Sequence, residues 1–164
     1  MDDLSRDLGE TPSGRLVGYR VLVVDRDTDA RRELRSLLLR EGARVLEASD
    51  GAEGLREAIR WQPDLIAFDP SAAGDGGPAL YRALRRDPRI DDIPVCVWTD
   101  RPDLRPRLCN QGVRSPDGLF LKPLHTDHAV DTMTRVLRVH GRWCSRRVAF
   151  EEAPRPDVSG LGLR

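Results

Sequence analysis

Short apolar runs alternate with helix-like segments between Tyr19 and His140, and this alternation limits the fold more than any other feature of the chain. Runs of this length, rich in β-branched residues and closed by a polar or turn-forming residue, are typical of strands buried on both faces of a sheet. The predicted strands are Val21–Val24, Ala43–Ala48, Leu65–Phe68, Ile93–Trp98 and Leu119–Leu121.

Helical patterns fill the intervals between these runs. A first helix is expected between Thr28 and Gly42, capped by Asp27 or Thr28, because its leucines recur at a spacing that places them on one face. Further helices are predicted at Ala52–Trp61, Pro78–Arg86, Arg101–Gln111 and around Val130–Leu137. Strands that alternate with helices form βαβ units, so we expect an α/β fold: a doubly wound five-stranded parallel sheet with flanking helices.

One domain is expected, spanning residues 19–140, because the chain is long enough for a single hydrophobic core with short tails. Residues 1–18 are polar and without periodicity, which predicts a disordered leader. Residues 141–164 are rich in Pro, Gly and Arg and are predicted to be a mostly disordered tail, in which Trp143 and Phe150 are available to dock back.

The composition excludes several classes of protein. The 27 basic residues balance the 27 acidic ones, so the chain has no charge excess for nucleic acid. Its apolar runs are too short to cross a membrane and its N-terminus lacks the regions of a signal peptide, so we expect a cytoplasmic protein with no membrane partner. Three cysteines without a CxxC spacing argue against a disulfide framework or a zinc site.

Polar residues capable of phosphoryl chemistry follow or end four of the strands: Asp25, Asp69, Thr99 and Lys122. In a doubly wound sheet, functional groups gather beyond the carboxyl ends of the strands. A carboxylate can attack a phosphoryl donor, while an ammonium group neutralises the phosphoryl oxygens and a hydroxyl bonds to one of them. Lys122 is the single lysine among the 27 basic residues, which indicates that an ammonium group rather than a guanidinium is needed there.

The segments that carry these residues resemble the response-regulator receiver family over Tyr19 to His140. The matching segments are Val21–Asp25, Pro63–Asp69, Ile93–Thr99 and Phe120–Pro123. The resemblance implies a flavodoxin-like fold with strand order 2-1-3-4-5. It also implies a non-enzymatic module of two-component signalling, with a histidine kinase or phosphotransfer protein and a downstream protein as partners. Whether the chain forms a homodimer is left open.

The resemblance also implies a role for each residue at the strand ends. Asp69 matches the phosphoacceptor, Thr99 the switch hydroxyl, Lys122 the phosphate-contacting lysine and Asp25 the first of a pair of acids. In the family this pair and the phosphoacceptor hold Mg²⁺, a cation that prefers oxygen ligands, and Ser71 falls where the family offers a backbone carbonyl to the metal. The implied metal ligands are therefore Asp25, Asp69 and Ser71.

The second acid of that pair is replaced by Arg26, which argues against Mg²⁺. Three carboxylates, one lysine and one Mg²⁺ sum to zero charge, and so do Asp25, Asp69, Arg26 and Lys122 without a metal. If the Arg26 guanidinium pairs with Asp69, attack on a phosphodonor should slow. The alternative is that Arg26 points into solvent and Asp27 supplies the missing ligand.

Two further departures concern the neighbours of the expected site. Pro70 follows the phosphoacceptor and has no N–H to offer a phosphoryl group, and the charge of Asp100 would repel phosphate. Two functions therefore stay open: a single-domain receiver phosphorylated on Asp69, and a phosphorylation-independent pseudo-receiver that acts as a protein-interaction module. The sequence contains neither GxGxxG nor GxxxxGK[ST], and His125, His128 and His140 are expected to be exposed or packing residues rather than a metal cluster.

Overall fold

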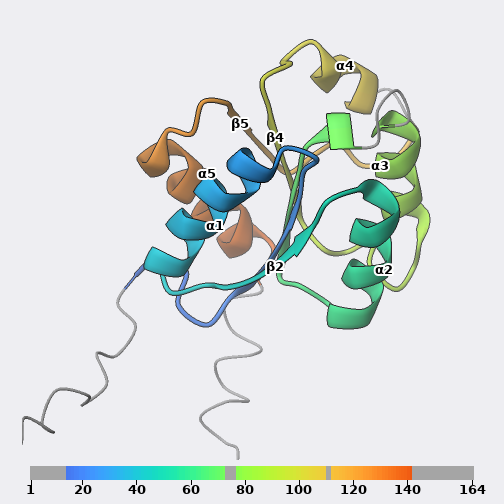
Figure 1. The fold of residues 1–164 in the computed structure, drawn as a ribbon. Helices are drawn as coiled ribbons and strands as arrows, with labels where there is room; N and C mark the ends of the chain where they lie inside the picture. The colour runs from blue at the N-terminus through green and yellow to red at the C-terminus, as the bar shows by residue number, and fades with distance from the viewer. Residues whose placement is uncertain (1–13, 73–76, 110–111, 142–164) are drawn as a thin grey trace, which may run out of the picture.

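The computed structural model describes residues 14–72, 77–109 and 112–141, and Figure 1 shows how their helices and strands alternate. The strands in these ranges are β1 Arg20–Val24, β2 Arg44–Ala48, β3 Leu65–Phe68, β4 Val95–Thr99 and β5 Gly118–Leu121. The helices are α1 Thr28–Arg40, α2 Gly51–Trp61, α3 Gly77–Arg86, α4 Leu104–Cys109 and α5 Thr126–Val139.

The strands form one parallel sheet in the order β2-β1-β3-β4-β5, which confirms the predicted topology. Val24 pairs with Phe68, and Thr99 pairs with Leu121. This register brings the carboxyl ends of β1, β3, β4 and β5 to one edge of the sheet.

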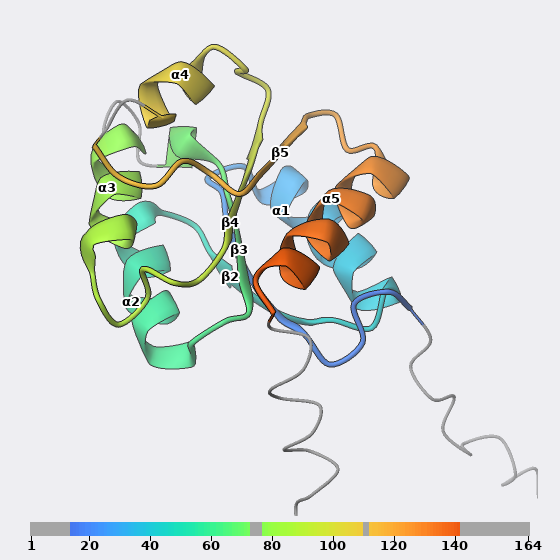
Figure 2. The ribbon, with the colours of Figure 1, turned by 180° about the vertical axis from the view of Figure 1, so that it is seen from behind.

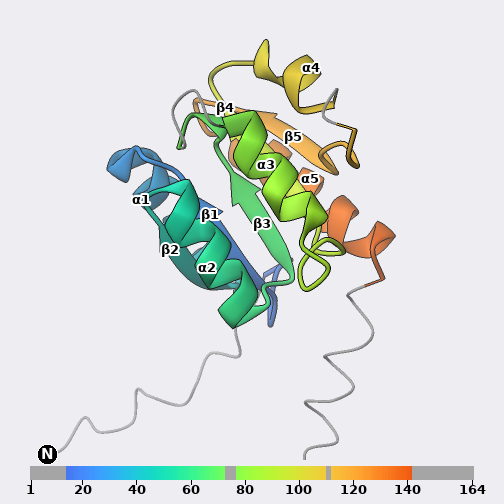
Figure 3. The same cartoon turned by 90° about the vertical axis from the view of Figure 1, so that its right-hand side faces the viewer.

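Helices cover both faces of the sheet. Helices α1 and α5 lie on one face and α2 and α3 on the other, as the two opposite views show (Figures 1 and 2). Figure 3 shows α2 and α3 side by side in front of the strands. Because successive side chains of a strand point to opposite faces, Val21 and Val23 pack under α1, whereas Leu22 and Val24 pack under α2.

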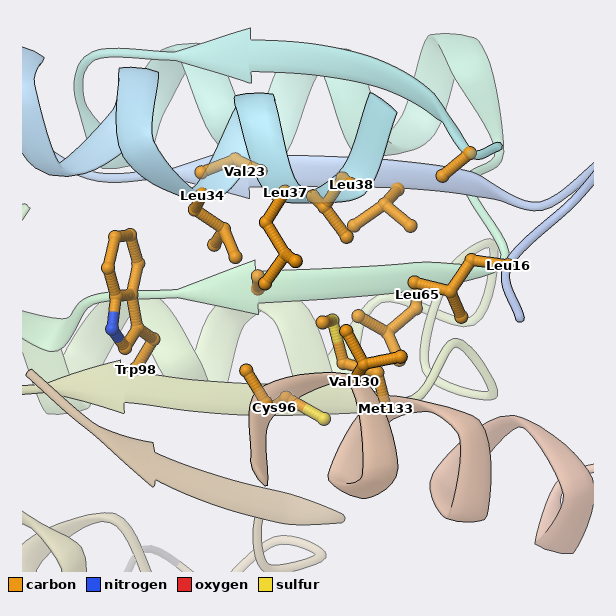
Figure 4. Close-up of a cluster of buried hydrophobic side chains, with 14 of the residues drawn as sticks. Leu16, Val23, Leu34, Leu37, Leu38, Leu65, Cys96, Trp98, Val130 and Met133 are labelled. Carbon is orange, nitrogen blue, oxygen red and sulfur yellow. The ribbon is translucent and has the colours of Figure 1, made fainter. Parts of the chain in front are cut away.

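The core between the sheet and the α1 and α5 helices is formed by leucines of α1, alternate strand residues and the apolar face of α5 (Figure 4). Trp98 of β4 belongs to this core and is 1% exposed. Its ring stacks on Phe120 of β5, with 6.0 Å between the ring centroids. The large aromatic side chain therefore reaches the sheet edge at which the strands end.

Two helix boundaries refine the expectations. Asp27 rather than Thr28 caps α1, because its side chain accepts hydrogen bonds from the backbone N–H groups of Asp29 and Ala30. Helix α4 is shorter than the predicted Arg101–Gln111 and begins only at Leu104. Pro106 lies in its first turn, where the missing N–H breaks no helical hydrogen bond.

Residues 14–18, which the sequence analysis assigned to the leader, contact the rest of the domain. Leu16 is fully buried, and its N–H donates to the carbonyl of Glu41 at 2.9 Å. Arg15 forms an ion pair with Asp131 of α5. Leu16 thus belongs to the core, and residues 14–18 of the expected leader are part of the described structure.

Residues 1–13 and 142–164, including Trp143 and Phe150, lie outside the described residues. Among the helices of the described ranges, none has the length and apolar character needed to span a membrane.

Candidate functional site

Two buried carboxylates and one ammonium group meet at the carboxyl edge of the sheet. Asp25 follows β1 and Asp69 follows β3, and they are 1% and 2% exposed. Lys122 follows β5, and its Nζ donates to Asp25 Oδ2 at 2.6 Å and to Asp69 Oδ2 at 2.7 Å. Residues from three separate strands therefore form one Asp25–Lys122–Asp69 cluster, as the parallel sheet led us to expect.

The second oxygen of each carboxylate holds the loop that follows its own strand. Asp25 Oδ1 accepts the N–H of Asp27, and Asp69 Oδ1 accepts the N–H of Ser71, both at 2.9 Å. Aspartates commonly bond to the backbone two residues further on. These bonds fix the orientation of both side chains, so that their Oδ2 atoms face Lys122.

Thr99 lies at the same edge but directs its hydroxyl elsewhere. Its carbonyl accepts the N–H of Lys122 at 3.0 Å, which makes the two residues neighbours. Its Oγ1 accepts the N–H of Arg101 at 3.0 Å. In the described part of the chain, the hydroxyl therefore bonds to the loop that precedes α4 and to neither carboxylate.

Trp98 is a third support of Lys122 that sequence reasoning missed. The Nζ of Lys122 lies 4.8 Å from the centroid of the Trp98 ring. A cation over an aromatic face is attracted by the ring quadrupole. The position of Trp98 directly before the strand-end threonine was the only signal in the sequence, and it did not distinguish a lysine contact from core packing.

Burial and charge act against each other in this cluster. Burial raises the pKa of Asp25 above its ordinary value, although the hydrogen bond from Lys122 opposes the shift. For Lys122, burial alone would lower the pKa, but the hydrogen bonds and charges of Asp25 and Asp69 raise it above the usual lysine value. The ammonium group therefore stays protonated at neutral pH.

Arg26 does not pair with Asp69 in the structure, and its side chain is exposed as in the second alternative. Its side chain is exposed, and among the described residues it forms no ion pair. Its backbone is held by Arg31, whose Nη1 donates to the carbonyls of Asp25 at 2.8 Å and Arg26 at 3.3 Å. Lys122 occupies the position that a paired Arg26 would have taken.

Asp27, the other candidate for the missing acid, is engaged as the cap of α1. Its Oδ1 accepts the N–H groups of Asp29 at 2.9 Å and Ala30 at 3.2 Å, and these bonds lower its pKa. Within the described ranges, no group of three or more His, Cys, Asp or Glu side chains is placed to hold a metal ion. Asp25 and Asp69 thus remain a pair without a third carboxylate ligand.

Pro70 is buried at the start of the short turn that follows Asp69. Its carbonyl oxygen lies 2.2 Å from the position that a Cβ on Gly77 would occupy, so only glycine fits at the start of α3. Asp100 is exposed. Of the three histidines named in the sequence analysis, His125 and His128 are exposed, whereas His140 contacts Asp117 at the opposite edge of the sheet.

Comparisons with known proteins agree with this geometry. The family model of the response regulator receiver domain matches residues 21–133. The chain is 35% identical over 122 residues to the transcriptional regulatory protein PrrA of Mycobacterium leprae, which covers 74% of this chain and 51% of PrrA. It is 27% identical to the protein PilH of Pseudomonas aeruginosa, over 72% of this chain and 97% of PilH. The chain therefore spans about half the length of PrrA but nearly all of PilH.

Solved structures share the fold. The chemotaxis response regulator CheY4 of Vibrio cholerae superposes with a TM-score of 0.64 and 25% identity, over 72% of this chain and 98% of CheY4. A CheY-like receiver domain protein of Methanospirillum hungatei has a TM-score of 0.66 and 20% identity, over 76% of this chain and 98% of its own. The second likeness concerns the fold alone.

Proposed function

This chain belongs to the response regulator receiver domain family of two-component signalling, and we propose that it accepts a phosphoryl group on Asp69 and signals through protein contacts. The observation that carries this proposal is the bond of 2.7 Å between Lys122 Nζ and Asp69 Oδ2 at the carboxyl edge of the sheet. The donor would be a histidine kinase or a phosphotransfer protein, and the receiver of the signal a downstream protein.

The chemistry follows from the groups in the cluster. An oxygen of Asp69 attacks the phosphorus atom of the donor, the bond from phosphorus to the leaving group breaks, and an acyl phosphate forms. Lys122 balances part of the added negative charge. The Thr99 hydroxyl, which holds the Arg101 N–H at 3.0 Å before phosphorylation, can turn to a phosphoryl oxygen. The loop before α4 would then lose this hydrogen bond, so that phosphorylation changes the surface around α4.

The finer features of the proposal rest on one relative and on the balanced charge of the chain. PilH supports a single-domain reading, because the match to this chain covers 97% of PilH. We propose a single-domain receiver, with residues 19–140 as its predicted domain extended to residue 14, that acts in the cytoplasm without nucleic acid, membrane or catalytic activity of its own. A homodimer is left open.

The test is phosphorylation by acetyl phosphate in the presence of Mg²⁺, followed by intact mass. The wild-type chain is expected to gain the mass of one phosphoryl group, and Asp69→Asn is expected to gain none. Asp91→Asn serves as the control, because it removes an exposed carboxylate between α3 and β4 that takes part in none of the hydrogen bonds of the cluster. Equal labelling of wild type and Asp69→Asn would contradict the assignment of Asp69.

A second function, a phosphorylation-independent interaction module, is favoured by Pro70. Proline offers no N–H to a phosphoryl group on the preceding residue, and Pro70 is buried directly beside Asp69. Under this function the wild-type chain stays unlabelled by acetyl phosphate, and beryllofluoride leaves the fluorescence of Trp98 unchanged. Labelling of the wild type on Asp69 would exclude it.

A further inference from the structure

We propose that the phosphoryl site of this chain works without a divalent cation, with Lys122 and Arg26 supplying the positive charge. Receivers of the family typically bind Mg²⁺ at the phosphorylation site. The inference rests on the proposed function only in taking Asp69 as the phosphoacceptor, because its claim about metal binding is tested without phosphorylation.

The first argument is the number of ligands. Mg²⁺ demands near-octahedral coordination by oxygen at about 2.1 Å and is usually held by carboxylates with the help of waters. Asp25 and Asp69 are the two carboxylates of the cluster, and no third acidic, His or Cys side chain within the described ranges joins them to form a metal-holding group. Arg26 stands at the position where the family has the third carboxylate.

The second argument is the position of Lys122. Its Nζ lies between the two carboxylates, 2.6 Å from Asp25 Oδ2 and 2.7 Å from Asp69 Oδ2. The Oδ1 atoms hold the N–H groups of Asp27 and Ser71. A cation that bridged the two aspartates would have to displace the ammonium group from both, and the Trp98 ring, whose centroid lies 4.8 Å from Nζ, stabilises the ammonium where it is.

The third argument is charge. Asp25 and Asp69 contribute −2 and Lys122 contributes +1, so the cluster carries −1, and Arg26 next to Asp25 brings the formal sum to zero. Removing a divalent ion from water is costly, and a neutral site repays little of that cost. The site is therefore suited to the charge of an arriving phosphoryl group rather than to that of Mg²⁺.

The surroundings of Arg26 leave its guanidinium available for this task. Its backbone is fixed by Arg31, which in turn pairs with Glu47 of β2 at 3.6 Å, while its side chain is exposed. A guanidinium binds phosphate oxygens with two parallel hydrogen bonds. On Asp69 the phosphoryl group would thus meet Lys122 from the sheet side and Arg26 from the solvent side.

The experiment compares Mg²⁺ binding by the full chain and by Arg26→Asp, which changes the formal charge of the site from zero to −2. Calorimetric titration and the fluorescence of Trp98 both report binding. Arg26→Asp is expected to bind Mg²⁺ about tenfold or more tightly than the wild type, and Mg²⁺ should raise the melting temperature of that variant only. Arg56→Asp, the same change at an exposed position of α2, controls for overall charge.

Equal Mg²⁺ affinity of wild type and Arg26→Asp would overturn the proposal. The absence of binding by both proteins would also overturn it, because something other than Arg26 would then exclude the ion. Labelling by acetyl phosphate in EDTA adds an independent readout: the wild type should be labelled equally with EDTA and with Mg²⁺. Labelling that requires Mg²⁺ would refute metal independence but leave the proposed function intact, whereas no labelling under either condition would count against the proposed function itself.

Discussion

At the scale of single residues, the site depends on the shape of one cation. An ammonium group is a compact charge with three donors, whereas a guanidinium is a planar fork. Lys122 uses its Nζ to reach two carboxylates and an aromatic ring within a small, largely buried space. The chain uses arginine at its 26 other basic positions, and the geometry explains why this position is different.

Replacing Lys122 by methionine should reveal the charge that the ammonium group balances. Lys122→Met leaves Asp25 and Asp69 buried without a counter-ion, so we expect the free energy of unfolding at pH 7 to fall by about 3–5 kcal/mol. The pKa of Asp25 should rise further in the folded variant, because the hydrogen bond from Lys122 that opposes the effect of burial is lost. A carboxyl group with a raised folded pKa favours the folded state at low pH, so the loss relative to wild type should shrink between pH 7 and pH 5.

Urea denaturation of both proteins at the two pH values measures this difference. Asp25→Asn is the matched control, because burial already raises the pKa of Asp25 and a neutral side chain removes that cost. Its loss of stability is expected to be smaller than that of Lys122→Met, because Lys122 keeps Asp69 as its ion-pair partner. A loss in Lys122→Met that is the same at both pH values would speak against two uncompensated carboxylates.

At the scale of elements, a second charged network joins the amino edge of the sheet to two helices. Asp117 Oδ2, just before β5, accepts Arg85 Nη2 of α3 at 2.6 Å and the N–H of Val95 in β4 at 2.8 Å. Its Oδ1 contacts His140 Nε2, at the end of α5, at 2.9 Å. The Arg85 side chain is 1% exposed and also donates to the hydroxyl of Tyr81 at 2.9 Å. This Asp117 network fixes α3 and α5 against the strands.

Asp117→Asn should weaken the contacts that hold α3 and α5 against the strands. Burial alone would raise the pKa of Asp117, but the Val95 N–H and Arg85 hold it below the ordinary value. A carboxylate with a lowered pKa contributes stability that is present above its unfolded pKa, about 3.9, and is lost as the pH falls through the lower folded pKa. We expect a loss of about 3 kcal/mol at pH 7, since Arg85 is left buried without its partner.

The loss should diminish as the pH falls below about 4, where the carboxyl group of the unfolded wild-type chain begins to be protonated. Thermal unfolding at pH 7 and at pH 3 provides the comparison. Asp103→Asn is the control, because its ion pair with Arg101 is more than half exposed on both sides and such surface pairs stabilise the fold little. If both substitutions cost the same at pH 7, the Asp117 network does not join the elements as described.

At the scale of the whole molecule, the segment before β1, residues 14–18, packs against the helices that cover one face of the sheet. The Leu16 side chain is fully buried in the core under α1 and α5, and its N–H bonds to Glu41 at the end of α1. Arg15 reaches both Glu41 and Asp131, and so connects the two helices of that face. The segment before β1 is therefore part of the layer that covers the sheet.

Leu16→Ala is expected to lower the free energy of unfolding by about 2–4 kcal/mol, because a fully buried leucine is removed and a cavity is left. Leu39→Ala, at a position in α1 that is 44% exposed, should cost well under that amount. Chemical denaturation of the two variants measures both effects. Equal and small losses would mean that residues 14–18 are not held in the core.

The sequence by itself determined the elements, their parallel arrangement and the residues that end the strands. The runs Val21–Val24 and Leu65–Phe68 are apolar throughout, which is typical of strands buried on both faces of a parallel sheet. The right-handed crossover between parallel strands then places their carboxyl ends at the same edge of the sheet. Asp69 and Lys122 could be placed together for this reason, without any knowledge of side-chain positions. The strand order, by contrast, came from the resemblance to the family.

The tertiary structure alone decided which partner each polar group takes. Local patterns did not say that the Thr99 hydroxyl bonds to Arg101, that Lys122 rather than Arg26 contacts Asp69, or that Trp98 supports Lys122. These outcomes depend on how segments that are far apart in the chain pack against one another. Periodicity records which face of an element is buried, but it carries no information about which of several nearby donors lies closest to a given oxygen.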